Sequence, residues 1–355
     1  MIVAMHSFRA ALLAISPEML ALIGEIDEFK GAWRAFGTLA PERLHQLRRV
    51  ATIESVGSST RIEGAKLSDR EVEALLGRVE AQSLATRDEQ EVAGYSAAME
   101  LIFASHAAIP ITEGTILQLH STLLKFSEKD DRHRGRYKIL PNRIEAFDGA
   151  GRSIGVVLET SPPLTTAREM EDLVAWYRRA TETREVHPLV AVGMFVAVFL
   201  AIHPFQDGNG RLSRALTTLL LLRAGYGYVP YSSLESVIER SKEDYYLALR
   251  RTQSTLAGGS PDWAPWLTYF LRAMQAQKRG LEAKIEYERL MRGTLPALAV
   301  QILELAAGHG SVSVREVVGA TGVPRATAKA WLGRLVAQGA LRTLGRGRGT
   351  RYARS

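Results

Sequence analysis

The sequence predicts a mainly α-helical protein with one small β-hairpin near its middle and a compact helix-and-hairpin unit at its C-terminal end. Over most of the 355 residues, apolar positions follow the three-to-four-residue spacing of helices. Between Gly135 and Pro163 this spacing gives way to short extended segments, and a second compact pattern begins after Pro296. A chain of this length has room for more than one core, so we expect two or three units.

Several helix ends can be recognised in the first part of the chain. Ser68-x-x-Glu71 is a capping-box signal that follows a break near Gly64, and Thr112 can cap another helix. The predicted helices cover residues 41–79 with this break, 89–106, 112–125 and, with interruptions, 166–289. The segments that read as extended are Ile139–Pro141, Ile144–Phe147 and Ile154–Leu158. Asp148-Gly149 between the last two is a turn signal for a hairpin.

The composition excludes some kinds of catalytic and metal site and indicates the cellular location of the protein. The absence of cysteine excludes disulfides, thiolate metal sites and cysteine nucleophiles. His6 and Arg9 interrupt the apolar N-terminal residues, so we expect no signal peptide. The longest apolar run, Leu189–Ile202, is fourteen residues, which is short for a bilayer and suits a buried helix. We therefore expect a cytoplasmic protein with no membrane partner.

The last 61 residues carry the excess positive charge. They hold nine Lys and Arg against Glu304 and Glu316, a balance of +7 that equals the formal net charge of the whole chain. Their predicted elements are a helix over 295–307, a Ser313-x-x-Glu316 capping box with a short helix, a turn at Gly322, a helix over 324–338 and strands over 340–344 and 350–353. This order is that of a winged helix-turn-helix. A local basic excess is typical of a unit that contacts a polyanion, usually nucleic acid.

The segment His203–Arg214 concentrates residue types that suit phosphate chemistry. It lies between the buried apolar run and a predicted helix over 211–224. Gly208 and Gly210 allow backbone N–H groups at a helix N-terminus to approach an anion closely. Arg211 and Arg214 share a helix face and can bind further phosphate oxygens.

Two other side chains complete this segment. Asp207 offers a hard oxygen ligand for Mg²⁺, and His203 has a pKa suited to accepting a proton near neutral pH. Taken one at a time, a lone histidine, a Gly-Asn-Gly turn or two helical arginines are usually structural. Their combination within twelve residues favours a phosphate site with general-base chemistry, although it does not decide which phosphorus is attacked.

At every fixed position this segment resembles the signature of the Fic (Fido) family, His-x-Phe-x-Asp/Glu-Gly-Asn-Gly-Arg-x-x-Arg. The resemblance extends over roughly residues 50–255. The flanking parts that carry it are the helix over 112–125, the flap borders Gly135-Arg-Tyr-Lys138 and Ser161-Pro-Pro163, and the pair Tyr245-Tyr246. It implies a helical catalytic domain with a small hairpin flap. The implied division is an N-terminal helical region over 1–108, the Fic domain over 109–256, a helical connector over 257–294 and the winged helix over 295–355.

The resemblance also implies a role for each site residue. His203 would deprotonate a Tyr, Thr or Ser hydroxyl of a target protein, and AMP would pass to it from ATP with release of pyrophosphate. Asp207 would hold Mg²⁺, Arg214 would fix the γ-phosphate and Phe205 would pack inward. The residues assigned to the nucleotide are Gly208, Asn209, Gly210, Arg211, Leu212, Ser213, Arg214 and Tyr246.

An upstream segment resembles the inhibitory motif of the same family, Ser/Thr-x-x-x-Glu-Gly/Asn. Ser59 and Glu63 are four residues apart, so on a helix they project from one face, and Gly64 follows. A glutamate paired with Arg214 would occupy the group meant for the γ-phosphate. Taken alone, Glu63 reads equally well as an ordinary helix residue with Gly64 as its stop. Together with the intact signature it predicts self-inhibition.

The partners are less sharply defined. The flap candidate, residues 142–160, would dock a target segment by strand addition, although a plain surface hairpin is the alternative. The C-terminal unit would contact DNA through Arg325, Lys329 and Arg334 with Arg346, Arg348 and Arg351 of the wing, or would dock a protein. Val323, Leu332 and Leu335 read as core of this unit. A homodimer is compatible with the sequence.

Four alternatives stay open for the function. The same site can use another nucleotide or phosphate-containing donor, and the same glutamate can position water to remove AMP. Self-modification is a further version of the enzyme. The alternative from a different class is a DNA-binding regulator in which the Fic unit senses a nucleotide.

Overall fold

The computed structural model describes residues 13–35, 41–78, 84–147, 153–258, 260–294, 297–337, 339–345 and 350–354. The chain divides into two compact units, Met1–Gly280 and Leu281–Ser355. Helix α11 (Ala264–Thr294) begins in the first unit and ends in the second. No helix among the described residues is long and apolar enough to cross a membrane.

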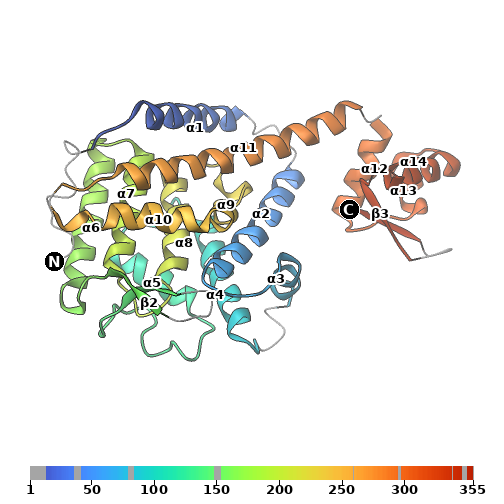
Figure 1. Cartoon of the computed structure of the whole chain (residues 1–355). Helices are drawn as coiled ribbons and strands as arrows, with labels where there is room; N and C mark the ends of the chain where they lie inside the picture. The colour runs from blue at the N-terminus through green and yellow to red at the C-terminus, as the bar shows by residue number, and fades with distance from the viewer. Residues whose placement is uncertain are drawn as a thin grey trace. The chain divides into compact units, whose positions relative to one another are not determined.

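The first unit is almost entirely helical (Figure 1). Its other helices are α1 (Pro17–Ala35), α2 (Pro41–Ile62), α3 (Asp69–Leu76), α4 (Arg87–Ser105), α5 (Glu113–Leu123), α6 (Pro163–Thr183), α7 (Pro188–Ile202), α8 (Asn209–Arg223), α9 (Leu234–Arg240) and α10 (Lys242–Gln253), with short 3-10 turns η4 (Val229–Tyr231) and η5 (Leu256–Gly258). Helix α7 forms the centre of the core, because every residue from Leu189 to Ile202 is buried. It packs against α6 and α8, and α8 also contacts α4.

The helix starts follow from local capping. The predicted capping box of Ser68 and Glu71 opens α3, and the predicted cap Thr112 accepts the Thr115 N–H at the start of α5. Thr86 and Glu89 form a further capping box at the start of α4. Helix α6 begins at Pro163, three residues before the expected Thr166, because proline is well suited to the first turn of a helix.

The hairpin in the middle of the chain consists of β1 (Arg143–Phe147) and β2 (Ser153–Glu159). The strands are antiparallel with Arg143 opposite Glu159, and two register shifts interrupt the ladder. The extended reading of Ile139–Pro141 was wrong, since these residues form a bend and join no strand. The predicted turn at Asp148-Gly149 lies outside the described residues.

The second unit has its own core. It contains α12 (Ala297–Gly308), α13 (Val314–Thr321), α14 (Arg325–Ala337) and an antiparallel pair of strands, β3 (Leu341–Leu344) and β4 (Arg351–Arg354). The predicted capping box of Ser313 and Glu316 opens α13, and Gly322 ends it with a left-handed φ of 70°. Leu332 and Leu335 are buried in this core, and Val323 packs against it, as predicted.

The contact between α4 and α5 gives a test of the core packing. A Cβ on Gly94 would overlap the backbone oxygen of Leu123, which cannot move away as a flexible side chain can. Gly94→Ala is expected to lower the free energy of unfolding by about 1–3 kcal/mol, the usual cost of overpacking. Thermal and urea unfolding measure this effect. The matched control is Gly24→Ala on α1, where nothing lies within 4 Å of the new methyl group, and this variant should be neutral or slightly stabilised. Equal stabilities of the two variants would contradict the packing.

Candidate active site

The loop between α7 and α8 is held by buried helices at both ends. His203 closes α7 in the left-handed conformation, with φ of 52°, and its N–H donates to the Phe199 carbonyl. Gly208 has φ of 81° and precedes the first residue of α8. A Cβ at Gly208 would lie 3.2 Å from Leu123 and 3.6 Å from the His120 ring, so the position has both steric and conformational reasons to be glycine.

Side chains of the loop itself fix its shape. The Asn209 side chain accepts from the Phe205 N–H at 2.9 Å and donates to the Phe205 carbonyl at 2.7 Å. Phe205 is fully buried, as predicted, and its ring stacks on His120 with 3.8 Å between ring centroids. Leu212 is also fully buried, and the Ser213 hydroxyl donates to the Gly210 carbonyl at 2.8 Å. These side chains of Asn209, Leu212 and Ser213 therefore hold the loop, and any ligand contact from these positions would use the backbone.

The N-terminus of α8 has unpaired donors that can bind an anion. The first N–H groups of a helix have no partner within the helix, and here no side chain caps them. Arg211 is 2% exposed, yet its Nε and Nη1 atoms find no hydrogen-bond acceptor among the described residues. Its Nη1 lies 3.3 Å from a carboxylate oxygen of Glu91, an ion-pair contact only. Donors that are buried and unsatisfied beside an uncapped helix N-terminus suit a phosphate group.

Asp207 lies among positive charges. Its two carboxylate oxygens contact the Arg211 guanidinium at 3.3 Å and the Arg87 guanidinium at 2.9 Å. Burial acts to raise the pKa of Asp207, but Arg211, the Gly208 N–H and Arg87 outweigh it and hold this pKa below its usual value. Asp207 is thus held ionised, and its carboxylate oxygens are of the hard type that Mg²⁺ prefers. Among the described residues no group of three or more His, Cys, Asp or Glu could hold a metal. One carboxylate fits Mg²⁺ that takes its other ligands from a nucleotide and water.

His203 has the properties of a base. Its half-buried ring has an Nδ1 atom 3.3 Å from the Leu200 carbonyl. Burial, with a smaller effect of Lys138, lowers its pKa from 6.5 to about 4, so the ring is neutral at pH 7. A neutral ring that donates from Nδ1 to Leu200 keeps a lone pair on Nε2. His203 can therefore accept a proton from a nearby hydroxyl.

The upstream motif meets the same loop. Arg214 is 4% exposed, and its Nη2 donates to the Glu63 carboxylate at 2.8 Å while its Nε donates to the Ser59 hydroxyl at 2.9 Å. A Cβ on Gly210 would overlap the Glu63 carboxylate, so Glu63 lies directly beside the start of α8. Ser59 and Glu63 thus project toward one partner, as their spacing predicts. The Tyr246 ring is partly exposed and packs edge-on against Tyr245, with 5.2 Å between centroids.

Sequence reasoning missed several side chains that contact this loop. His120 is fully buried, donates from Nε2 to the Asp207 carbonyl at 3.0 Å and accepts the Gly135 N–H at 2.9 Å. The other missed contacts come from Arg87, Lys138 and Asn142. His120 is one of several polar residues in α5, with Gln118 and Ser121 nearby, so the sequence gives no sign that it is buried against the loop. Arg87 gives no signal, because only the fold brings α4 beside the loop.

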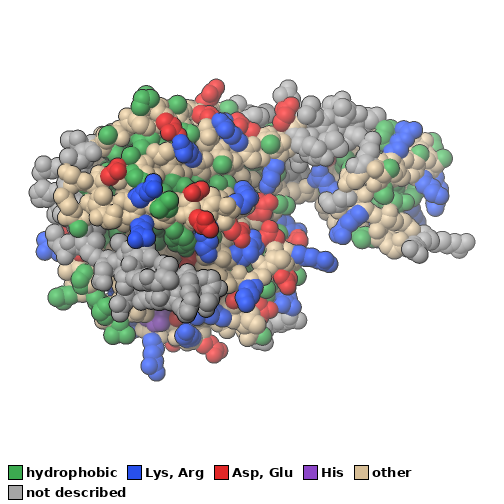
Figure 2. All heavy atoms as spheres, viewed as in Figure 1, with side chains coloured by type: hydrophobic (Ala, Val, Ile, Leu, Met, Phe, Trp, Pro, Cys, Tyr) green, Lys and Arg blue, Asp and Glu red, His purple; other side chains and the backbone are tan. Residues whose placement is uncertain are grey.

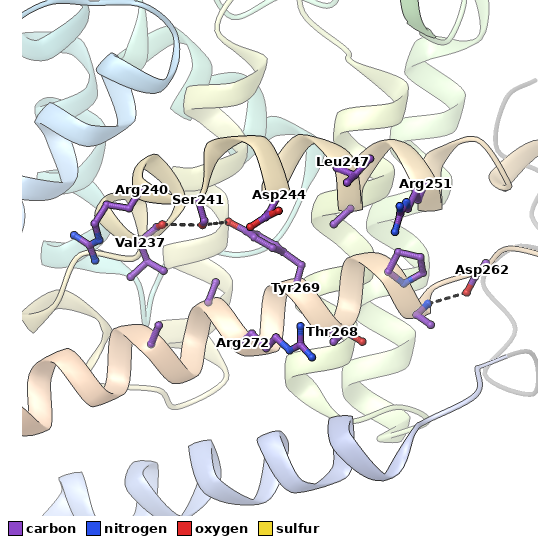
Figure 3. Close-up of a pocket in the computed structure, with 15 residues that line it drawn as sticks. Val237, Arg240, Ser241, Asp244, Leu247, Arg251, Asp262, Thr268, Tyr269 and Arg272 are labelled. Atoms are coloured by element: carbon purple, nitrogen blue, oxygen red, sulfur yellow. Dashed lines mark hydrogen bonds between the residues drawn. The ribbon is translucent and has the colours of Figure 1, made fainter.

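The structure also has cavities away from the loop. One of about 800 Å³ lies along α9, α10 and α11. In Figure 3, Tyr269 of α11 points toward Ser241 at the start of α10, and the two hydroxyls are 2.8 Å apart. Another, of about 1000 Å³, lies at the ends of α6 and α8. The residues that line these two cavities include none of the segment 203–214.

The fold and the loop resemble those of known Fic proteins. The family model described as Fic/DOC family matches residues 110–221, which include α5 to α7, the loop and all but the last two residues of α8. The structure of a Fic family protein from Desulfovibrio desulfuricans G20 is similar over 97% of each chain, with a TM-score of 0.63 and 26% identity. Fic-1 from C. elegans has the same fold over 76% of this chain and 73% of its own, with a TM-score of 0.60 and 21% identity. The chain therefore has a mainly helical Fic fold with a small C-terminal two-stranded hairpin.

The chain is also similar to curated Fic proteins, at low identity and over part of their length. This chain is 28% identical over 203 residues to the protein adenylyltransferase Fic of Drosophila grimshawi, which is 57% of this chain and 39% of that protein. It is 27% identical over 206 residues to the protein of the same name in Drosophila mojavensis, 58% of this chain and 38% of that one. The chain thus spans about two fifths of the length of these relatives. It is a distant homologue of these Fic adenylyltransferases.

The buried His120 predicts a dependence of stability on pH. Burial lowers its pKa from 6.5 to about 4, so the unfolded chain binds the proton more readily between these values. The stability that comes from neutral His120 is complete above about pH 6.5 and is lost as the pH falls toward 4, on the order of 3 kcal/mol at about 1.4 kcal/mol per pH unit. Urea unfolding of wild type and His120→Gln from pH 7 to pH 4 measures it. The two stabilities should converge at low pH, whereas parallel curves would contradict the assignment.

Proposed function

We propose that this protein is a self-inhibited protein adenylyltransferase that moves AMP from ATP to a Tyr, Thr or Ser hydroxyl of a protein. The observation that carries the proposal is the loop 203–214, where a neutral histidine, an uncapped helix N-terminus and buried unsatisfied arginine atoms meet. Nucleophile activation and phosphate binding are the two functions that nucleotidyl transfer needs. The distant similarity to Fic adenylyltransferases supports the choice of ATP and of AMP as the transferred group.

The proposed reaction assigns one function to each group. Nε2 of His203 takes the proton of the target hydroxyl, whose oxygen forms a bond to the α-phosphorus while the bond from that phosphorus to the pyrophosphate oxygen breaks. Backbone N–H groups of Gly210 and Arg211, with the Arg211 guanidinium, hold the phosphate oxygens. Arg214 holds the γ-phosphate end. Asp207 would hold Mg²⁺, which would neutralise charge on the phosphates.

In the inhibited form the protein's own side chains neutralise the site. The Glu63 carboxylate pairs with Arg214 and lies against Gly210, where its negative charge opposes a phosphate. The Arg87 guanidinium pairs with Asp207, where its positive charge opposes a cation. Productive binding of ATP with Mg²⁺ therefore requires both Glu63 and Arg87 to leave. Glu63 is one third exposed and Arg87 half exposed on their side chains, so both have room to do so.

The target would dock on the hairpin. The strands β1 and β2 pair only with each other, so among the described residues the hairpin has free edges to which an extended segment can add. Self-modification and removal of AMP with Glu63 positioning a water are compatible with the same site. A homodimer and a cytoplasmic location stay predictions from the sequence.

The first experiment tests transfer, inhibition and the base together. With α-³²P-ATP and Mg²⁺, we expect label on protein with Glu63→Gly and little label with wild type or with Glu63→Gly/His203→Ala. The gain should be at least about tenfold, which needs only about 1.4 kcal/mol of relieved competition at Arg214. Glu63→Gln is the matched control, because it keeps the size of the side chain and removes the charge. It should label between wild type and Glu63→Gly.

Each other outcome has a definite meaning. Equal labelling by wild type and Glu63→Gly would exclude Glu63 as the inhibitory group. Labelling that survives His203→Ala would exclude His203 as the base. If none of the proteins labels but all bind ATP, the donor is another nucleotide or the chain is a nucleotide-sensing regulator. In the last case His203→Ala would leave the biological output unchanged.

We further propose that residues 295–355 form a winged helix-turn-helix that contacts DNA. The observation that favours DNA is helix α14, which presents the exposed Arg325, Lys329 and Arg334 and has no acidic residue along its length. Lys and Arg side chains are spread over the visible face of this unit in Figure 2. Arg351 differs from our expectation, because it pairs with Glu316 at 3.0 Å and donates to Ser311. Arg346 and Arg348 lie outside the described residues.

DNA binding can be measured on the full chain. Fluorescence anisotropy with a duplex should give an affinity that falls as salt rises, and Arg325→Ala/Lys329→Ala should reduce the logarithmic salt slope by about 1–2, since each phosphate contact contributes about 0.9. The control is Arg168→Ala/Arg179→Ala, which removes the same charge from exposed positions on α6. Binding that is absent, or insensitive to salt, would favour a protein partner for this unit.

A further inference from the structure

The turn that carries His203 is held by the base of the hairpin as well as by its own two helices. Lys138 donates from its Nζ to the Ile202 carbonyl at 3.0 Å and from its backbone N–H to the Pro204 carbonyl at 2.9 Å. The Asn142 amide donates to the Phe205 carbonyl at 2.8 Å and, less closely, to the His203 carbonyl at 3.4 Å. Four successive carbonyls, from residue 202 to residue 205, thus accept hydrogen bonds from two residues that precede β1.

The same two residues are tied to the other end of the hairpin. Lys138 donates further to the Asn142 side chain at 2.8 Å and to the Thr160 hydroxyl at 3.0 Å. The Thr160 hydroxyl in turn lies 2.6 Å from the Asn142 carbonyl. Asn142 immediately precedes β1 and Thr160 immediately follows β2. We call Lys138, Asn142 and Thr160 the flap stem, since they join both ends of the hairpin to the loop.

Lys138 acts here as a structural cation. It is 3% exposed, and its three ammonium protons go to three acceptors, Ile202, Asn142 and Thr160. Burial lowers its pKa to about 8. An amine with all its protons engaged has no free lone pair for nucleophilic chemistry and no free donor for a phosphate. Among the described residues, the hydrogen bonds of its side chain go to the stem and to Ile202 at the start of the turn.

The conformation of His203 explains why such support is needed. A residue other than glycine in the left-handed conformation costs on the order of 1–3 kcal/mol. It keeps this conformation only where the surrounding structure enforces it. His203 has φ of 52°, and the ring position depends on this turn. If the carbonyls on either side were released, the backbone could relax and carry the ring away.

We propose that the flap stem positions His203 for proton transfer and couples the order of the hairpin to that of the base. Lys138, Asn142 and Thr160 are positioning residues, because they act through the backbone of the turn. Among the described residues, their hydrogen bonds do not involve the proposed phosphate-binding groups Arg211 and Arg214. The inference rests on the proposed role of His203. A target segment that adds to the hairpin would order the flap stem. Docking of the target would therefore also hold His203 in the position needed for proton transfer.

The sharpest variant is Asn142→Asp in the Glu63→Gly protein. Aspartate has the same shape and still accepts from Lys138, but it loses the donors to His203 and Phe205 and turns a carboxylate oxygen toward their carbonyls. The turnover number for transfer should fall at least about tenfold, equivalent to 1.4 kcal/mol. The KM for ATP should stay within about twofold, because the phosphate-binding groups are untouched.

A matched pair at Thr160 keeps the test valid if Asn142→Asp folds poorly. Thr160→Val removes the hydroxyl and keeps the shape, whereas Thr160→Ser keeps the hydroxyl. The turnover number should fall about threefold or more for Thr160→Val and stay near the parent value for Thr160→Ser. The valine removes both the acceptor of the Lys138 ammonium and the donor to the Asn142 carbonyl, whereas serine keeps both. Equal rates for the two Thr160 variants, or a loss confined to the KM for ATP, would overturn the proposal.

A second readout does not depend on transfer. The chain has eight histidines, and the ring signals of His203 can be assigned by NMR from their loss in His203→Ala. Asn142→Asp should shift or broaden the His203 signals and leave most other histidines unchanged. If the His203 signals respond to Asn142→Asp but the Glu63→Gly protein transfers no AMP, the positioning role is supported and the proposed function is wrong. If Glu63→Gly transfers AMP and the His203 signals do not respond to Asn142→Asp, the positioning is wrong and the function stands.

Discussion

The junction of α7 and α8 is the constraint on which the rest of the first unit depends. Both helices are buried along nearly their whole length, so the residues between them cannot shift without disturbing the core. The loop must still expose a base and an anion-binding helix end. It does so through two left-handed residues, His203 and Gly208, and through an internal cross-link from Asn209 to Phe205. The packing of the apolar core thus fixes the positions of the backbone groups and side chains of the loop.

The polar side chains that contact the loop between α7 and α8 form two sets. His120 and the flap stem bind backbone carbonyls of the loop and determine its shape. Glu63 and Arg87 instead bind the charged side chains Arg214 and Asp207, the groups proposed for phosphate and metal. A buried arginine without a counterion is costly, so Glu63 also stabilises the folded protein in the absence of nucleotide. A substrate that carries both phosphate and metal would replace both contacts at once.

The two units differ in how their positive charge is used. In the first, the arginines nearest the loop are paired with carboxylates or buried beside a helix N-terminus. In the second, basic residues of α14 are exposed, and Arg351 is fixed by Glu316. Charge alone is therefore a poor guide to contact with a polyanion. An arginine or lysine can contact a polyanion only if the fold places no acidic side chain beside it.

The sequence by itself determined the helical class, the capped starts at Ser68, Thr112 and Ser313, the central apolar helix and the segment 203–214, because these depend on spacing and local hydrogen bonds. It also related Glu63 to Arg214, though only through a family resemblance. The tertiary structure alone decided the contacts of His120, Arg87, Lys138 and Asn142 with the loop. These partners are separated from it by about 60 to 120 residues of chain, and no periodic pattern encodes which buried carbonyl a distant donor will satisfy. That choice is made only when the helices pack.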